Sequence, residues 1–317
     1  MSEAFALDPR VLDFRSGPCH LQSELERLEA VRRAGAYEAG VFYAARILEV
    51  TTLFTLQDLE LDTSHNTFHN LAVMESVGLL AGADIYTGYA LRQLGNAARH
   101  VLAPVVGPDL DAGLSFLAAW LDWFFVRRPT GPRLNAVTDR GGPWRPARTR
   151  SGRLVAVVLD QIADEGVPSR DVEEEVIDDA GADSVSQRTL LALVAESLVE
   201  SGALPRAREF LRRARALAPA DPRLREIEAL RLRRQGDHGA AIDLLAPHVE
   251  AGHGDEESVG ILAAALKARA EVEGRGEDMA RAHELYHRAW RRSQDRNAWL
   301  GVNAATTALY LGRHEVA

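Results

Sequence analysis

The sequence predicts an all-α fold in two parts, a helical bundle followed by an array of repeated helix pairs. Apolar residues recur at helical spacing from Leu21 onward. Aromatic residues make up only 6% of the chain, while Ala, Leu and Arg, which all favour helices, are abundant. After Gln187 the pattern repeats, with Gly202 and Gly236 about 34 residues apart. A length of 317 residues suits about two domains.

Composition narrows the class of protein. The single cysteine, Cys19, excludes a disulfide framework and suits a reducing, cytoplasmic setting. Residues 1–18 lack the basic start and apolar core of a signal peptide, and no apolar run reaches the roughly 18 residues of a membrane span. The net charge of −9 argues against a general nucleic-acid coat. We therefore expect a cytoplasmic protein without membrane contact.

Five helices are predicted in the first part, after an irregular lead-in over residues 1–18. Glycines, prolines and a polar interruption, in which Ser64 or Asn66 could cap the following helix, separate them. The last helix is nearly all apolar and carries two Trp and two Phe at 120–125, so it is either central in the bundle or part of a dimer interface. The predicted helices cover residues 21–33, 37–59, 67–81, 84–102 and 110–126.

A polar row is predicted on the fourth helix. Arg92, Asn96 and His100 are spaced i, i+4, i+8, which places their side chains in one line along a helix. Asn96 and the adjacent Gly95 are poor helix formers, and such local conflicts tend to mark sites. A cation, an amide and an imidazole in one row can hold a phosphate or another helix.

Two segments of this part resemble the HEPN family of small helical bundles. They are Tyr37–Arg46, a row of small residues ending in Arg, and Leu91–His100, which is similar to a form of the family's late helix. The resemblance covers roughly residues 20–128. In HEPN ribonucleases two copies meet across a dimer and cut RNA without a metal. The resemblance implies this role for the polar row, together with a homodimer.

Three roles remain open for the polar row. A ribonuclease would use His100 to transfer protons near neutral pH, and Arg92 to neutralise charge on the scissile phosphate. The row could instead bind RNA or a nucleotide without catalysis. It could also make packing hydrogen bonds to a neighbouring helix or lie in a dimer interface.

A composition break follows the bundle. Residues 127–153 contain eight arginines among prolines and glycines that exclude a long helix. We interpret this segment as a solvated hinge, with a basic arm along RNA or an acidic partner as the alternative. Residues 154–167 form a short apolar element, either helix or strand, with helix preferred. The acidic stretch 171–183 is a mobile connection or a solvated helix start, and it could pair with the basic segment.

From Gln187 the chain reads as helix pairs with the tetratricopeptide period. Ala207, Ala241 and Ala282 fall where two helices approach closely. Each unit buries its apolar face only on its neighbours, so the pairs form a curved stack with a concave face for ligands. The predicted pairs are 188–201 with 205–217, 222–235 with 238–250, and 256–272 with 277–293, followed by a first helix at 297–311.

The end of the array resembles the tetratricopeptide-type TRAFs-binding domain. The resemblance rests on residues 280–290 and 299–313, which include the run GVNAATTALYLGR, and it covers about 187–317. In that family the region regulates an effector through protein contacts. The resemblance implies a partner protein on the array, and we expect a further helix after Arg313.

Two histidine pairs have the spacing of metal ligands. His283 and His287 lie in a literal H-E-x-x-H motif, but no third ligand follows, and the motif sits among packing positions of a repeat helix. His65 and His69 are interpreted as a surface pair at a helix start. No phosphate-binding loop or dinucleotide fingerprint is present, so no metal and no cofactor is predicted.

The sequence thus predicts a HEPN-like bundle over 1–128, a basic then acidic linker over 129–186, and a repeat domain over 187–317. The preferred function is a regulatory or adaptor protein of a prokaryotic defence or stress system. Its array would bind a partner protein, and its bundle would dimerise and bind RNA or a nucleotide. The alternative is a metal-independent ribonuclease, with Arg92, Asn96 and His100 as catalytic residues, controlled by the array.

Overall fold

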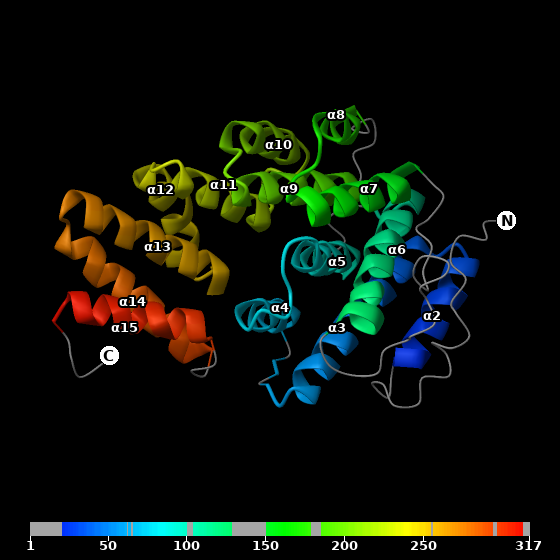
Figure 1. Cartoon of the computed structure of the whole chain (residues 1–317), viewed down its shortest axis with the longest axis horizontal. Helices are drawn as coiled ribbons and strands as arrows, with labels where there is room; N and C mark the ends of the chain where they lie inside the picture. Colours follow the sequence, from blue (N-terminus) through cyan, green and yellow to red (C-terminus); the bar gives the residue numbers. More distant parts are fainter. Residues whose placement is uncertain are drawn as a thin grey trace. The chain divides into compact units, whose positions relative to one another are not determined.

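The protein is α-helical throughout the residues that its structure, a computed structural model, describes (Figure 1). Within them lie 14 α-helices, one π-helix and no strand, which confirms the predicted all-α class. Contacts divide the chain into two compact units, Met1–Ser197 and Leu198–Ala317, and each is considered by itself. The described residues are 21–61, 63–64, 66–99, 104–128, 150–178, 185–254, 256–293 and 297–312.

The first unit begins with the helices expected from the apolar periodicity. Predictions for 21–33 and 37–59 are confirmed, whereas the helix expected over 67–81 ends at Ser76. It ends early because Gly78 adopts a φ of +74°, which turns the chain so that the Leu79 amide donates to the Met74 carbonyl. The helices are α2 (Leu21–Arg33), α3 (Tyr37–Asp58), α4 (Thr67–Ser76), α5 (Ala83–Arg99), α6 (Gly107–Asp122), α7 (Arg150–Glu165), α8 (Arg170–Asp178) and α9 (Val185–Glu200), whose last turn crosses into the second unit.

Helix α3 is the centre of this unit. It packs against α2, α5 and α6, and α6 in turn packs against α7. Trp120 is fully buried, and its indole Nε1 donates a 2.7 Å hydrogen bond to the hydroxyl of Thr51 on α3. The aromatic residues 120 and 123–125 are therefore core residues of the bundle, and the dimer-interface interpretation of this helix is wrong.

Helix α3 also bears on the expectation that no segment could span a membrane. Within the described part of the chain it is the one helix long and apolar enough to cross a membrane, by length and composition only. Its most apolar window is more than half buried inside the protein. A central helix of a bundle has this composition because several neighbours cover it.

The expected helix 110–126 is interrupted near its end. After Asp122 the chain forms a π-helical turn, η1 (Trp123–Arg127). The wider turn lets Arg127 pair with Asp84 at 2.8 Å, while the next residue, Arg128, is buried with its guanidinium carbon 4.4 Å from the centre of the Phe124 ring. Burial lowers the pKa of Arg128. Arg128 therefore belongs to the core of the bundle, and Arg127 forms an ion pair at its edge.

Part of the segment expected as a linker is helical. The preference for helix over 154–167 is confirmed by α7, which packs on α6 and buries Leu154, Val158 and Ile162. The acidic stretch begins as α8 with two buried valines. Most of the basic segment, residues 129–149, lies outside the described residues, so its interpretations stay predictions.

The second unit is a run of antiparallel helices that follow one another along the chain. Consecutive helices pack together, and α13 makes its most extensive contacts with α14. The predicted pairs agree with the observed bounds to within a few residues. These helices are α10 (Leu204–Leu217), α11 (Pro222–Arg234), α12 (His238–Glu250), α13 (Glu256–Glu273), α14 (Gly276–Arg292) and α15 (Ala298–Tyr310).

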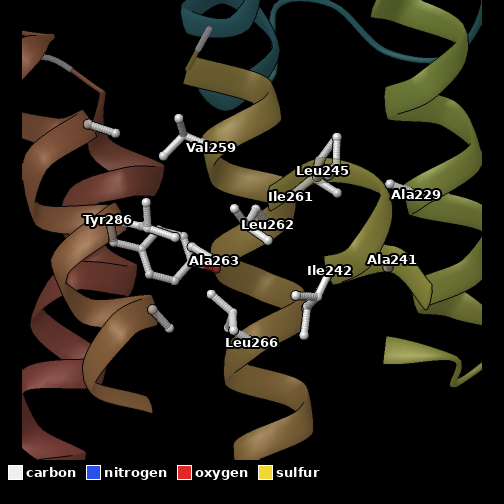
Figure 2. Close-up of a cluster of buried hydrophobic side chains, with 14 of the residues drawn as sticks. Ala229, Ala241, Ile242, Leu245, Val259, Ile261, Leu262, Ala263, Leu266 and Tyr286 are labelled. Atoms are coloured by element: carbon white, nitrogen blue, oxygen red, sulfur yellow. The ribbon is translucent and has the colours of Figure 1, made fainter. Parts of the chain in front are cut away.

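The core of this unit explains its repeat pattern. Figure 2 shows Leu262 and Leu266 of α13 between the side chains of α12 and Tyr286 of α14. Ala241 and Ala282 are fully buried, as expected where helices approach closely. Each first helix of a pair is followed by a glycine with positive φ that reverses the chain, and these are Gly202, Gly236, Gly274 and Gly312.

Candidate functional site

Helix α5 carries the polar row predicted from the sequence. Arg92 and Asn96 lie four residues apart, so their side chains leave the same side of the helix, and both are half-buried. His100, the third member of the row, lies outside the described residues, and its place in the row stays a prediction.

A cleft of about 450 Å³ opens beside this part of α5, a size typical of small-ligand pockets. Arg92 and Asn96 both line it, together with Arg99 one turn further on. Helix α3 and the start of α4 supply the other walls. The lining residues are Ala45, Leu48, Glu49, Ser64, Asn66, Thr67, Arg92, Asn96 and Arg99.

Helix packing sets the position of the row. A Cβ atom at Gly95 would lie 2.2 Å from the Cβ of Ala45 on α3, a distance at which two carbons overlap. Gly95 therefore lets α5 lie directly against α3, which also brings Ala45 and Leu48 into the cleft wall. The poor helix former that drew attention to this stretch is a packing residue, and the site next to it is a consequence of that packing.

Hydrogen bonds hold the wall formed by the start of α4. The side chain of Asn66 caps the helix by accepting a 3.0 Å hydrogen bond from the Phe68 amide, as the sequence allowed. The side-chain amide of Asn70 makes two hydrogen bonds to the backbone of Ser64. It accepts one from the Ser64 amide at 2.8 Å and donates one to the Ser64 carbonyl at 2.9 Å. These contacts fix the segment that leads into α4, and the helix N-terminus adds partial positive charge at the cleft.

Two arginines of the cleft lie over aromatic rings. The guanidinium carbon of Arg92 is 5.0 Å from the centre of the Phe68 ring, and that of Arg99 is 5.5 Å from the centre of the Phe42 ring. Such contacts orient a guanidinium and keep its charge. Arg99 also lies 3.8 Å from Glu49, with both side chains more than a third exposed. An exposed pair of this kind contributes only about 0–1 kcal/mol, so an anionic ligand can compete for Arg99.

A third nearby arginine belongs to the bundle structure. Arg46, which ends the first segment of HEPN resemblance, donates two 2.9 Å hydrogen bonds to the buried carboxylate of Glu24. These hydrogen bonds raise the pKa of Arg46 although burial opposes them. Arg46 therefore ties α3 to α2, and the positive charge of the cleft comes from Arg92 and Arg99.

The cleft suits a phosphate group. Guanidinium groups and a carboxamide donate hydrogen bonds to phosphate oxygens, and hydroxyls of Ser64 and Thr67 add short polar groups. Within the described part of the chain, the Asn96 amide makes no hydrogen bond to another residue, so it is available to a ligand. Among the described residues, no group of three His, Cys, Asp or Glu side chains lies close enough together to hold a metal ion.

The sequence did not identify Arg99 and Glu49 as residues of this cleft, although both line it. Arg99 could have been found, because it lies seven residues after Arg92 and so shares the same helix face. Glu49 could not, because it lies on α3 and reaches the cleft only through the contact of α3 with α5.

The described members of the two histidine pairs, His283 and His69, are buried in the helix packing. In the H-E-x-x-H motif, His283 is buried, with Nδ1 3.1 Å from the carbonyl oxygen of Ala304 and 3.2 Å from the hydroxyl of Thr307. This contact joins α14 to α15, as the packing interpretation expected. His69 is buried on α4, so its predicted surface position is wrong. His65 lies outside the described residues.

The repeats of the second unit identify its type. Residues 204–308 match the sequence model of a family described as Tetratricopeptide Repeats-Sensor. The C-terminal part is a tetratricopeptide-type repeat domain. The match covers α10 to most of α15, and a repeat domain of this type has a protein-interaction or sensing role. Comparison with curated proteins and with solved structures gave no match. The HEPN resemblance of the bundle and the TRAFs-binding resemblance of the array stay predictions.

Proposed function

We propose that this protein is a cytoplasmic regulatory adaptor. Its tetratricopeptide-type array binds a partner protein, and its N-terminal bundle binds the phosphate of RNA or of a nucleotide in the cleft between α3, α4 and α5. The observation that carries the second half is the convergence of Arg92, Asn96 and Arg99 on one cleft. The match of residues 204–308 to the sensor family supports the first half.

The side chains that line the cleft favour a ligand that carries hydrogen-bond donors in addition to a phosphate. Arg92 and Arg99 supply the charge that a phosphate or phosphodiester needs. Glu49 on the α3 wall accepts hydrogen bonds only, so it matches hydroxyl or amine donors such as those of a ribose or a base. A nucleotide, free or within RNA, offers both. The resemblance to HEPN proteins supports a defence or stress setting for such recognition.

A metal-independent ribonuclease is the second candidate. It is favoured by the shared cleft position of Arg92 and Asn96, two of the three residues to which the resemblance assigns catalysis. A nuclease also needs a group that transfers protons, which is the role assigned to His100.

The binding proposal is tested by fluorescence anisotropy with a labelled single-stranded RNA oligonucleotide and, separately, a labelled mononucleotide. Arg92→Ala should weaken binding by roughly 10-fold or more, because it removes a charge-assisted hydrogen bond. Asn96→Ala should weaken it less. The matched control is Arg33→Ala, which removes an exposed arginine paired with Glu29 outside the cleft. Equal affinity of the wild type and Arg92→Ala would exclude the cleft as the binding site.

The ribonuclease candidate is tested on total RNA and on tRNA with EDTA present. Cleavage that survives EDTA and disappears in both Arg92→Ala and His100→Ala supports a nuclease. Absence of cleavage by the folded wild type, with RNA binding intact, leaves the cleft as a binding site.

A further inference from the structure

Helix α10 is the most positively charged helix of the repeat domain. It carries five arginines and one acidic residue, Glu209. The second helices of the other two pairs take the same place in their repeats with a different charge, since α12 has no arginine or lysine and two acidic residues, and α14 has four arginines and three acidic residues. The repeat fold therefore does not require the positive charge of α10, which contrasts with the chain's net charge of −9.

Three of these arginines form a row along α10. Arg208, Arg212 and Arg215 are spaced i, i+4 and i+7, so at 100° per residue they fall within about 60° of the helix circumference and span roughly 10 Å. Arg208 and Arg212 are exposed, and Arg215 is half-buried. The buried residues of the helix, which include Phe210 and Ala214, lie on a different side. We call these three arginines the arginine row.

The charge of the arginine row is only partly neutralised within the described residues. Arg212 lies 2.6 Å from Glu209, which also pairs with Arg213 at 2.8 Å. The Arg212 and Glu209 side chains are 65% and 42% exposed, and exposed ion pairs of this kind are weak. In the described part of the chain, Arg208 and Arg215 have no ion pair and no side-chain hydrogen bond. The arginine row can therefore bind an anionic partner without losing a strong contact.

We propose that the arginine row binds a helical segment of the partner protein that carries acidic residues at i, i+4 and i+7. A guanidinium forms paired hydrogen bonds with a carboxylate, as Arg212 does with Glu209 at 3.0 and 2.6 Å. Carboxylates with this spacing share one face of a helix and repeat at the same distances as the arginines. The proposal rests on the partner-binding half of the proposed function and names the chemistry of that partner.

A protein partner fits the arginine row better than RNA does. Proteins that bind single-stranded RNA stack its bases on aromatic side chains beside the positive charge. The single aromatic residue of α10, Phe210, is buried in the core, so this face of the helix offers charge without a stacking surface. Helix α10 also lies within residues 204–308, which match a repeat family, and such repeats bind proteins.

Fluorescence anisotropy of the full chain with labelled model peptides tests the proposal. The probe is an Ala- and Gln-based peptide of about 20 residues, long enough to form a helix, with three glutamates at i, i+4 and i+7. The comparison peptide has the same composition, with its glutamates on different faces. At low salt, where charges are little screened, the probe should bind roughly 5-fold more tightly than the comparison peptide. Arg208→Gln/Arg215→Gln should weaken binding of the probe by roughly 10-fold, because it removes two charge-assisted contacts.

The matched control is Arg288→Gln/Arg292→Gln, which removes two exposed arginines of α14. It changes the net charge equally and should leave the affinity for the probe within about 2-fold of the wild type. No binding of the probe, or equal binding of the two peptides, overturns the proposal. Loss of RNA binding rather than of peptide binding in Arg208→Gln/Arg215→Gln also overturns it.

One outcome separates this proposal from the proposed function. If the probe binds equally to the wild type and to Arg208→Gln/Arg215→Gln, the protein recognises acidic segments through another face. The proposed partner binding then stands, and the arginine row is not the site.

Discussion

Gly95 carries the close contact of α5 with α3. We expect Gly95→Ala to destabilise the protein by about 1–3 kcal/mol through overpacking, although Ala gains about 1 kcal/mol over Gly in helix propensity. The cause is the 2.2 Å approach of the new Cβ to Ala45. Urea denaturation measures the free energy of unfolding. Ala45→Gly should rescue the variant, because it removes the atom that the new Cβ meets.

Gly113 on α6 is the matched control for this prediction. A Cβ at Gly113 would have its nearest neighbours at 3.8 Å, an ordinary contact. Gly113→Ala should therefore leave stability unchanged or raise it by up to ~1 kcal/mol. Similar losses at Gly95 and Gly113 would show that close packing is not the cause.

Asp278 gives the repeat domain a stability that depends on pH. Arg269 donates hydrogen bonds of 2.7 and 3.0 Å to its carboxylate, and these bonds hold the pKa of Asp278 below its ordinary value of 3.8, although burial opposes them. Because the folded pKa is the lower one, the contribution is present above the unfolded pKa and is lost as the pH falls through the folded pKa.

Asp278→Asn should therefore lower the free energy of unfolding by about 1–3 kcal/mol at neutral pH and make its decline on acidification less steep. Urea denaturation over a pH series measures both effects. Glu284→Gln, which changes an exposed carboxylate of α14, should change neither. An unaltered acid slope in Asp278→Asn would assign the pH dependence to other carboxylates.

Asp109 joins two helices of the first unit that are far apart in sequence. Its fully buried carboxylate accepts a 2.9 Å hydrogen bond from the Val106 amide at the start of α6 and a 2.7 Å hydrogen bond from the Ser186 amide at the start of α9. A short side chain with two acceptor oxygens thus sets the place where α9 begins. The predicted start of that helix near residue 188 lay a few residues later, because a partner on α6 is invisible in the sequence.

Asp109→Ala should leave the buried amide of Ser186 and the part-buried amide of Val106 without their acceptor, at a cost of about 1–3 kcal/mol. Hydrogen exchange followed by mass spectrometry should show faster exchange in the first turn of α9. The control Asp164→Ala removes an exposed carboxylate of α7 and should lie within about 0.5 kcal/mol of the wild type. Unchanged exchange in α9 would mean that other contacts hold its first turn.

The whole chain has two cores, one in each unit. Leu48 is fully buried in the bundle, and Leu266 is fully buried in the repeat domain (Figure 2). We expect two thermal transitions in calorimetry. Leu48→Ala should lower the first unit's transition and Leu266→Ala the other's, each by about 2–5 kcal/mol of unfolding free energy. A single transition lowered equally by both would show that α9 couples the units into one cooperative structure.

Helix periodicity made most of the fold predictable. The bounds of α2, α3 and the repeat helices follow from apolar spacing and turn glycines, because both are local properties of the chain. The end of α4 and the π-turn after α6 depend on local backbone geometry that periodicity does not encode. The aromatic residues 120–125 fitted either a core or an interface, since burial by other helices decides between them.

The sequence by itself determined the all-α class, the repeat period and the pairing of Arg92 with Asn96 on one helix face. Only the tertiary structure decided that this face lines a cleft with Glu49 of α3 and the start of α4, and that Gly95 serves helix packing. It also decided that His283 is buried against Ala304 and Thr307 of α15. The physical reason is that helical spacing fixes neighbours within a helix, whereas contacts between helices depend on how their surfaces fit together.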